Sequence, residues 1–170
     1  MNLNKNIVLI GMMGSGKSTI GYLLSKNINF NFLDVDKHIE KETNLKINDI
    51  FLKKGENYFR NLEEKITLKT LKLTDCVISL GGGSFINEKI RKETLTNHLS
   101  FWLNWDELTL LNRIKNSKTR PLALKLTDQE IKQLIKKRSK IYSKALFKIN
   151  CDKLTKTEIV KKIIKIYEHN

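Results

Sequence analysis

Apolar and polar positions divide the chain into short apolar runs and longer segments in which apolar residues recur every three or four positions. The short runs predict strands at residues 6–11, 30–35, 76–81, 99–104 and 146–150. The longer segments predict helices at residues 17–28, 56–73, 87–97, 106–115, 128–144 and 155–168. Strands and helices that alternate in this way are typical of a parallel sheet covered by helices on both faces. We therefore expect an α/β fold built on a five-stranded parallel sheet.

The chain length of 170 residues suits a single domain over residues 1–170, and a hydrophobic content of 40% is ordinary for a globular protein. No apolar segment approaches the roughly 20 residues that a membrane span needs. The N-terminal stretch has no small-residue cleavage site after its short apolar run, which argues against a secretory signal. Cys76 and Cys151 are solitary, without the spacing of a metal site or a disulfide framework. These features predict a soluble, cytoplasmic protein.

The formal net charge is +14, and most of the excess lies in the second half of the chain. Residues 86–170 carry 20 Lys or Arg against 9 Asp or Glu, whereas residues 1–85 carry 12 against 9. Strongly basic chains often bind nucleic acid or anionic lipid. Here 27 of the 32 basic residues are lysines scattered over predicted helices, so solvated helix faces explain the charge more simply. A nucleic-acid-binding module remains the alternative from a different functional class.

Six of the eight glycines fall at two places, positions 11, 14 and 16 and positions 81–83, each directly after a predicted strand. Ligands of open parallel sheets bind outside the carboxyl ends of the strands. Both glycine clusters therefore lie where a binding site is expected. At 81–83, three glycines after an apolar strand indicate close approach of the backbone to another group, although a loose turn is the simpler alternative.

The stretch GMMGSGKS at residues 11–18 matches the phosphate-binding pattern G-x-x-x-x-G-K-[ST] between a predicted strand and a predicted helix. Glycines let consecutive backbone N–H groups surround a polyphosphate, and the helix adds its positive N-terminal end. Lys17 would then meet the outer phosphates, and the Ser18 hydroxyl would bind Mg²⁺. The alternative is a glycine-rich connection with an accidental lysine. The predicted nucleotide-binding residues of this stretch are Gly11, Met12, Met13, Gly14, Ser15, Gly16, Lys17, Ser18 and Thr19.

Two aspartates, Asp34 and Asp36, stand at the end of the second apolar run in the stretch FLDVD. Residues two apart in an extended chain share a face, so both carboxylates are expected to point into one cleft. Asp34 would hold magnesium, directly or through water, and Asp36 would accept a proton from an attacking hydroxyl. Alternatively, these aspartates cap and open a helix within DVDKHIEKE.

Only five of the 32 basic residues are arginines. Arginine makes bidentate contacts with a carboxylate that lysine cannot reproduce, so an arginine in a lysine-rich chain indicates a geometric demand. Arg138 falls on the apolar stripe of its predicted helix, which aims its charge inward, toward an anionic ligand or a structural carboxylate. Arg60 has three glutamates within one helical turn that would pair with it in place of a ligand: Glu56, Glu63 and Glu64.

This set of motifs resembles that of the shikimate kinase family, whose members are small P-loop kinases of the nucleoside monophosphate kinase structural class. Besides the phosphate loop, the matching pieces are DVD (34–36), IFLKKGENYFRNLE (50–63), LGGGS (80–84), RPL (120–122) and RSKIY (138–142). The resemblance runs from about residue 6 to residue 150. It implies a single-domain P-loop kinase fold with a substrate-binding segment at about 35–63 and a mobile lid at about 115–126. The implied reaction moves the γ-phosphoryl group of ATP to the 3-hydroxyl of shikimate, on the way to chorismate and the aromatic amino acids.

The resemblance also implies roles for individual residues. Lys17, Asp36 and Arg120 would be catalytic, with Asp36 as the base and Arg120 reaching the ATP phosphates from the lid. Arg113 would lie near the adenine, and Ser18 and Asp34 would hold the Mg²⁺. The implied shikimate site comprises Asp36, Phe51, Phe59, Arg60, Gly81, Gly82, Gly83 and Arg138. In that site the two arginines would grip the shikimate carboxylate, and the glycine N–H groups would approach the ring.

One segment departs from the family pattern, because 150–158 lacks the proline often found there, and this leaves the contacts to the adenine open. Another small-molecule kinase of the same fold, such as a gluconate or nucleoside monophosphate kinase, is the nearest alternative. Its substrate would not need two arginines that converge with three glycines and paired aspartates. We expect a monomer that binds ATP and shikimate, with no nucleic acid and no membrane as partner.

Overall fold

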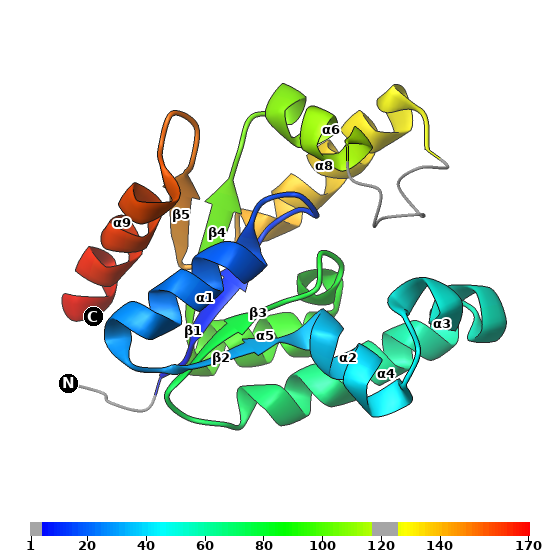
Figure 1. Cartoon of the computed structure of the whole chain (residues 1–170), viewed down its shortest axis with the longest axis horizontal. Coiled ribbons are helices and arrows are strands. Elements are labelled where there is room, and N and C mark those ends of the chain that lie inside the picture. Colours follow the sequence, from blue (N-terminus) through cyan, green and yellow to red (C-terminus); the bar gives the residue numbers. More distant parts are fainter. Residues whose placement is uncertain (1–4, 117–125) are drawn as a thin grey trace.

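The computed structural model describes residues 5–116 and 126–170, and their strands form one parallel sheet in the order β2-β3-β1-β4-β5 (Figure 1). The strands are β1 Ile7–Ile10, β2 Asn31–Asp34, β3 Cys76–Ser79, β4 Leu99–Asn104 and β5 Phe147–Asn150. Every strand predicted from an apolar run is present, within two residues of its expected bounds. The predicted five-stranded parallel sheet is confirmed.

All six predicted helices are present, and the described residues also form two helices that periodicity did not predict. The expected ones are α1 Lys17–Ile28, α4 Glu56–Leu71, α5 Glu88–Asn97, α6 Glu107–Lys115, α8 Asp128–Tyr142 and α9 Lys156–Glu168. The additional ones are α2 Val35–Thr43 and α3 Ile47–Lys54, with a 3₁₀ turn, η1 Ser84–Ile86. The connection from β2 to β3 therefore holds three helices, of which α2 and α3 lie beyond the edge of the sheet and α4 runs back to pack against it (Figure 1).

Side chains of β1 alternate between two apolar layers, one on each face of the sheet. Val8 and Ile10 pack with residues of α4, α5 and α8, whereas Ile7 and Leu9 pack with residues of α1 and α9. All four β1 side chains are buried, as expected for a central strand covered on both faces. Figure 1 shows α1 and α9 on the near face of the sheet and α5 and α8 on the far face. The helices therefore cover both faces, as predicted.

The helix α2 begins at an aspartate, so the alternative given for DVDKHIEKE is confirmed and the shared strand face expected for Asp34 and Asp36 is wrong. Asp34 has extended backbone angles and its carboxylate accepts a hydrogen bond from the Lys37 N–H, which makes it the N-cap of α2. Asn44, in the left-handed conformation, ends the helix. Asp36 lies in the first turn of α2, so the two aspartates are placed by a helix start and not by a shared strand face.

The helix α3 takes its cap from another helix. Its own N-cap position is Lys46, whose side chain makes no capping hydrogen bond. Instead, the Glu40 carboxylate of α2 accepts a hydrogen bond from the Ile47 N–H at 3.1 Å and pairs with the Lys46 ammonium at 3.0 Å. Glu40 thereby sets how α3 follows α2.

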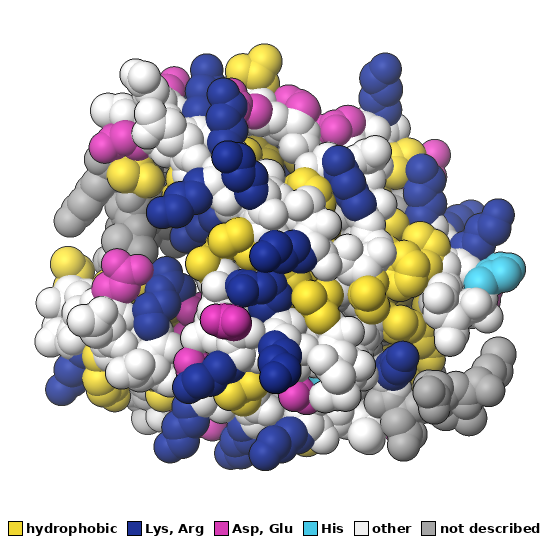
Figure 2. Space-filling view, turned by 180° about the vertical axis from the view of Figure 1, so that it is seen from behind, with side chains coloured by type: hydrophobic (Ala, Val, Ile, Leu, Met, Phe, Trp, Pro, Cys, Tyr) yellow, Lys and Arg dark blue, Asp and Glu magenta, His cyan; other side chains and the backbone are white. Residues whose placement is uncertain are grey.

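The surface carries its positive charge in a dispersed form. Figure 2 shows Lys and Arg side chains over one whole face of the molecule, among acidic, apolar and other polar side chains and not gathered into one patch. The lysines at 136, 140 and 144 are exposed, as expected for solvated helix faces, whereas Lys132 is half-buried.

Among the described residues, no helix combines the length and the apolar character needed to cross a membrane.

Candidate active site

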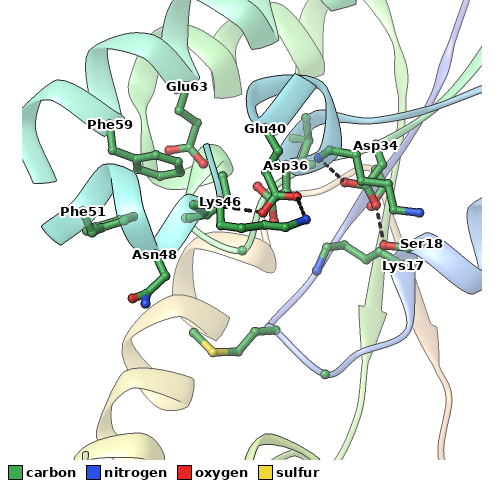
Figure 3. A pocket seen from close by; sticks show the side chains of 18 of the residues that line it. Lys17, Ser18, Asp34, Asp36, Glu40, Lys46, Asn48, Phe51, Phe59 and Glu63 are labelled. Atoms are coloured by element: carbon green, nitrogen blue, oxygen red, sulfur yellow. Dashed lines mark hydrogen bonds and ion pairs between the residues drawn. The ribbon is translucent and has the colours of Figure 1, made fainter. Parts of the chain in front are cut away.

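A pocket of about 1000 Å³ opens at the carboxyl edge of the sheet, between the β1–α1 loop, the start of α2, the α3–α4 pair and the loop after β3 (Figure 3). Most of the predicted site residues line it. These are Met13, Gly14, Gly16, Lys17, Ser18, Thr19, Asp34, Asp36, Phe51, Phe59, Arg60, Gly82, Gly83 and Arg138. Predicted nucleotide-binding residues and predicted shikimate-binding residues, which are far apart in the sequence, therefore line one cavity.

The β1–α1 loop has the backbone expected for a phosphate cradle. Gly14 and Gly16 have φ values of +83° and +86°, a region that favours glycine, and α1 begins directly after them. The Lys17 ammonium donates hydrogen bonds to the carbonyl oxygens of Gly11 at 2.8 Å and Met12 at 3.1 Å. The lysine side chain thus folds back along the loop, with its charge on the side where phosphates of a nucleotide would lie.

A hydroxyl and a carboxylate meet beside this loop. The Ser18 hydroxyl donates a hydrogen bond to the Asp34 carboxylate at 2.5 Å, while the other oxygen of Asp34 caps α2 (Figure 3). Hydroxyl, carboxylate and phosphate oxygens are the ligands that Mg²⁺ prefers. Among the described residues, no group of three or more His, Cys, Asp or Glu side chains has the arrangement of a metal site. These residues fit an ion bound mainly through nucleotide phosphates and water.

The loop after β3 passes so close to polar side chains that any residue larger than glycine at position 81 would displace them. A Cβ atom there would lie 2.6 Å from Asp36 Oδ1, 2.7 Å from Glu63 Oε1 and 2.8 Å from Ser84 Oγ. The Ser84 hydroxyl donates to Glu63 Oε1 at 2.7 Å, which holds the buried glutamate in place. The close approach predicted for the three glycines is thus observed, and at position 81 it brings the backbone between Asp36 and Glu63.

The next two glycines each face one arginine. A Cβ atom on Gly82 would lie 3.5 Å from Arg138 Nη1, and one on Gly83 would lie 2.5 Å from Arg60 Nη1. Arg60 comes from α4 and Arg138 from α8, on opposite sides of the loop. Both guanidinium groups therefore border one short stretch of backbone, and both line the pocket that also contains Lys17.

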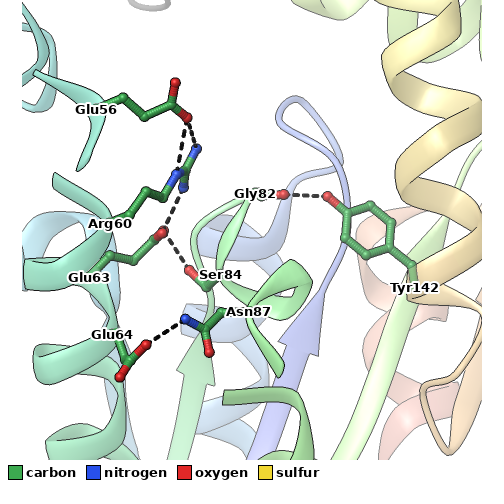
Figure 4. Close-up of polar contacts among 8 residues, drawn as sticks. All are labelled: Glu56, Arg60, Glu63, Glu64, Gly82, Ser84, Asn87 and Tyr142. Atoms are coloured by element: carbon green, nitrogen blue, oxygen red, sulfur yellow. Dashed lines mark hydrogen bonds and ion pairs between the residues drawn. The ribbon is translucent and has the colours of Figure 1, made fainter. Parts of the chain in front are cut away.

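Arg60 lines the pocket and also pairs with two of the three glutamates that the sequence places near it. Its Nη1 donates to Glu63 at 2.6 Å, and its Nε and Nη2 donate to Glu56 at 3.3 Å (Figure 4). Burial disfavours the charged guanidinium, but the two carboxylates outweigh this and raise the pKa of Arg60 above its ordinary value. The third candidate partner, Glu64, instead contacts Lys89 and Asn87.

Two phenyl rings support the Arg60 guanidinium. The rings of Phe51 and Phe59 lie 4.5 Å apart between centroids, and Arg60 Cζ lies 5.9 Å and 5.2 Å from them. Cation–π contacts of this kind limit the positions that the guanidinium can take. The phenyl pair therefore forms an apolar wall beside a fixed positive charge.

A second cavity, of about 560 Å³, lies on the other side of the β1–α1 loop and contains Arg113. The Arg113 guanidinium lies over the Trp105 ring with Cζ 3.8 Å from the ring centroid. Residues from the segment after β5 complete the cavity, namely Leu154, Thr155, Lys156 and Ile159. The phosphate loop therefore separates two cavities, one with the paired arginines and one with Arg113.

A family model described as shikimate kinase matches residues 13–168 of the chain. A shikimate kinase from Sulfurihydrogenibium sp. (strain YO3AOP1) is 43% identical over 160 residues, which cover 94% of this chain and 96% of that protein. The chain belongs to the shikimate kinase family. The crystal structure of shikimate kinase from Aquifex aeolicus vf5 matches with a TM-score of 0.87 and 41% identity over 97% of each chain. Shikimate kinase from Acinetobacter baumannii in complex with shikimate matches with a TM-score of 0.92 and 30% identity over 99% of this chain and 95% of that one.

In this member of the shikimate kinase family, sequence reasoning missed Glu63 and Trp105, which line the two cavities, and Tyr142, which donates a hydrogen bond to the Gly82 carbonyl. Glu63 entered only as a rival partner of Arg60, although its spacing of three residues on one helix was the available signal. Tyr142, within the RSKIY piece, had no assigned role, and Trp105 had no signal at all. Arg120, the predicted catalytic arginine of the lid, lies outside the described residues, as does most of the predicted lid at 115–126.

Proposed function

We propose that the chain transfers the γ-phosphoryl group of ATP to the 3-hydroxyl of shikimate. The observation that carries the proposal is the single pocket that brings together Lys17 of the phosphate loop, Asp36, and the guanidinium groups of Arg60 and Arg138. Shikimate offers one carboxylate and three hydroxyls. A pocket with forked cations, a carboxylate base and a phosphate cradle suits an anionic polyol that must reach a terminal phosphate.

The two arginines would bind the acceptor carboxylate. Arg138 would be the more available of the two, because no ion pair of Arg138 with a carboxylate occurs among residues 5–116 and 126–170. Its Nη1 lies 3.7 Å from Met12 Sδ. Arg60 is held by Glu63, so it would offer the edge of the guanidinium that now faces the exposed Glu56. The N–H groups of Gly82 and Gly83 and the phenyl wall of Phe51 and Phe59 would complete the site.

Asp36 would act as the base for the acceptor hydroxyl. Its carboxylate lies against Gly81 and lines the same pocket as Lys17, so a hydroxyl bound there lies between a proton acceptor and the phosphate cradle. Phosphoryl transfer depends mainly on positioning and on stabilising the charge of the transferred group. Lys17 supplies positive charge next to the cradle, and direct in-line transfer needs no covalent phosphoenzyme.

Mg²⁺ would bind with ATP near Ser18 and Asp34. When bound there, the ion neutralises charge on the nucleotide phosphates. The chain supplies a hydroxyl and a carboxylate oxygen that already lie within hydrogen-bond distance of each other.

Arg113 would lie near the adenine in the second cavity, and Arg120 would reach the phosphates from the lid. We also propose that residues 1–170 form one kinase domain with an acceptor-binding segment at 35–63, acting as a cytoplasmic monomer.

The deciding experiment is a coupled assay of ADP release with shikimate, quinate, gluconate and nucleoside monophosphates as acceptors, each with ATP and Mg²⁺. Shikimate should give the highest kcat/KM by a wide margin. Higher turnover with gluconate or a nucleoside monophosphate would overturn the proposal in favour of another kinase on this fold. A salt-titrated DNA and RNA binding assay addresses the remaining class, because binding through phosphate neutralisation weakens steeply with salt.

A further inference from the structure

Trp105 lies immediately after β4 and reaches back to the phosphate loop. Its indole N–H donates a hydrogen bond to the carbonyl oxygen of Ser15 at 2.9 Å, across 90 residues of sequence. The side chain is half-buried and lines the second cavity together with Gly14, Ser15 and Gly16. A residue outside the glycine-rich motif therefore contacts the backbone in the middle of that motif.

This hydrogen bond orients one peptide group of the phosphate loop. In a trans peptide the C=O and N–H point in opposite directions, so the Ser15 carbonyl that faces the indole directs the Gly16 N–H away from it. Gly16 has φ +86°, and a Cβ atom placed there would meet nothing within 4 Å. The Gly16 carbonyl accepts a hydrogen bond from the Ile20 N–H at 2.9 Å, which fixes the peptide on the other side of Gly16. The indole supplies the corresponding hydrogen bond for the Ser15–Gly16 peptide.

The same indole carries the Arg113 side chain. Arg113 Cζ lies 3.8 Å from the ring centroid, within the range of a close cation–π contact, and its Nη1 donates to the Gly14 carbonyl at 3.5 Å. Among the described residues, Arg113 forms no ion pair with a carboxylate, and its side chain is exposed. The aromatic ring is therefore the main group that holds the guanidinium beside the loop.

The second cavity places both contacts next to one ligand site. Trp105 and Arg113 line it on one side, and Leu154, Thr155 and Ile159 line it on another, with Gly14 and Gly16 at the border shared with the first pocket. A ligand with phosphates in the loop and a planar base beyond them would pass along this border. An arginine held against an aromatic ring suits stacking on such a base.

We propose that Trp105 is a positioning residue for the nucleotide, which it serves through two separate contacts. Its N–H fixes the Ser15–Gly16 peptide for the phosphates, and its ring fixes Arg113 for the base. The proposal rests on the proposed function only in assuming that a nucleotide occupies the phosphate loop. It makes no use of the acceptor.

Two substitutions separate the contacts. Trp105→Phe keeps a ring under Arg113 and removes the N–H donor, whereas Trp105→Leu removes both. Calorimetry with ADP and with inorganic tripolyphosphate, each with Mg²⁺, distinguishes phosphate binding from base binding. Trp105→Phe should weaken both ligands by a similar factor of about 2–10, the scale of one neutral hydrogen bond. Trp105→Leu should weaken ADP by a further factor of about 2–5, the scale of an exposed cation–π contact, and tripolyphosphate no further.

A matched control is Tyr22→Leu, which removes an exposed ring that also has a cation over it, Lys26 at 5.6 Å from the centroid. This variant should bind ADP like the original chain. Unchanged ADP affinity in Trp105→Leu would overturn the proposal, and so would equal weakening of ADP and shikimate, which would indicate a general structural role. Because ADP binding needs no acceptor, absence of shikimate phosphorylation would refute the proposed function and leave this test intact.

Discussion

The hydroxyl of Tyr142 donates a hydrogen bond to the carbonyl oxygen of Gly82, which joins the last turn of α8 to the loop after β3 (Figure 4). Arg138 lies one helical turn before Tyr142, and its Nη1 would lie 3.5 Å from a Cβ on Gly82. One turn of α8 therefore both presents a guanidinium to the pocket and holds the backbone that faces it. Burial raises the pKa of Tyr142 to about 12, so the phenol stays a donor at any ordinary pH.

Tyr142→Phe removes only this hydroxyl. Because the ring stays packed in the core and the Gly82 carbonyl loses its donor, we expect KM for shikimate to rise about 3–10-fold with a smaller change in kcat. KM for ATP should stay within about two-fold, because the phosphate loop is not altered. Steady-state kinetics with each substrate varied in turn checks this, with Tyr167→Phe on α9 as a control. If both KM values rise equally, Tyr142 supports the fold and not the acceptor site.

Long, periodic elements of this fold follow from the sequence, whereas α2 is indicated only by the capping alternative for DVDKHIEKE and α3 is not predicted. β1 and α1 are predicted because the apolar run IVLI and the glycine-lysine pattern are local signals. In contrast, α3 has eight residues and buries only Ile50, and its capping carboxylate comes from Glu40, seven residues before Ile47. A rule that looks for a capping side chain next to the helix start finds Lys46 there, which does not cap.

The site follows the same division. The phosphate loop and the glycine cluster at 81–83 are predicted from the sequence, since each needs only neighbouring residues to be recognised. The contacts of Trp105 with Ser15 and of Tyr142 with Gly82 span 90 and 60 residues. Such contacts depend on the strand order, which places β4 beside β1 and β3 on its other side. Periodicity predicts that strands exist but not which strand ends lie together.

Gly81→Ala should abolish acceptor binding while leaving nucleotide binding intact. The added methyl group would meet Asp36, Glu63 and Ser84 at 2.6 to 2.8 Å, so all three side chains must move. We expect kcat/KM for shikimate to fall at least about 100-fold, because displacement of reacting groups by about 1 Å has effects of this size. Gly83→Ala meets one side chain, Arg60, at 2.5 Å and not three, and should lose less. ADP affinity near the original value in both variants, measured by calorimetry, separates this effect from unfolding.

The two glutamates that hold Arg60 should differ in importance because they differ in exposure. The Glu63 side chain is 4% exposed and the Glu56 side chain 65%. Glu63→Gln leaves the guanidinium without its buried counter-charge, so the free energy of unfolding should fall by about 1–3 kcal/mol and KM for shikimate should rise. Glu56→Gln removes an exposed pair and should change stability by at most about 0.5 kcal/mol. Urea denaturation checks the ranking, which equal effects of the two substitutions would contradict.

Asp36→Asn tests the base. The amide is nearly the same size as the carboxylate and cannot accept the hydroxyl proton, so kcat should fall by about 100-fold to 10,000-fold. ADP binding should be unaffected, because Asp36 faces the acceptor side of the pocket beside Gly81. Single-turnover measurements with saturating shikimate isolate the chemical step. A kcat within about three-fold of the original would exclude Asp36 as an essential base.

His98 should make the fold sensitive to mild acid. It is 5% exposed at the C-cap of α5, directly before β4, and neither ring nitrogen has a hydrogen-bond partner among the described residues. Burial lowers its pKa from the ordinary 6.5, an effect to which nearby Lys5 adds and which nearby Glu93 opposes. The unfolded chain therefore binds a proton at a higher pH than the folded chain does.

The sign of the linkage follows from this difference. Above about pH 6.5 both states have neutral His98 and stability is full, whereas stability falls as the pH drops below that value, because protonation favours the unfolded state. Chemical denaturation between pH 5 and pH 8 should show this loss in the original chain. His98→Leu should reduce the slope, since it removes the buried titrating group, while His169→Gln at an exposed position should retain it. An unchanged slope in His98→Leu would assign the acid sensitivity to other groups.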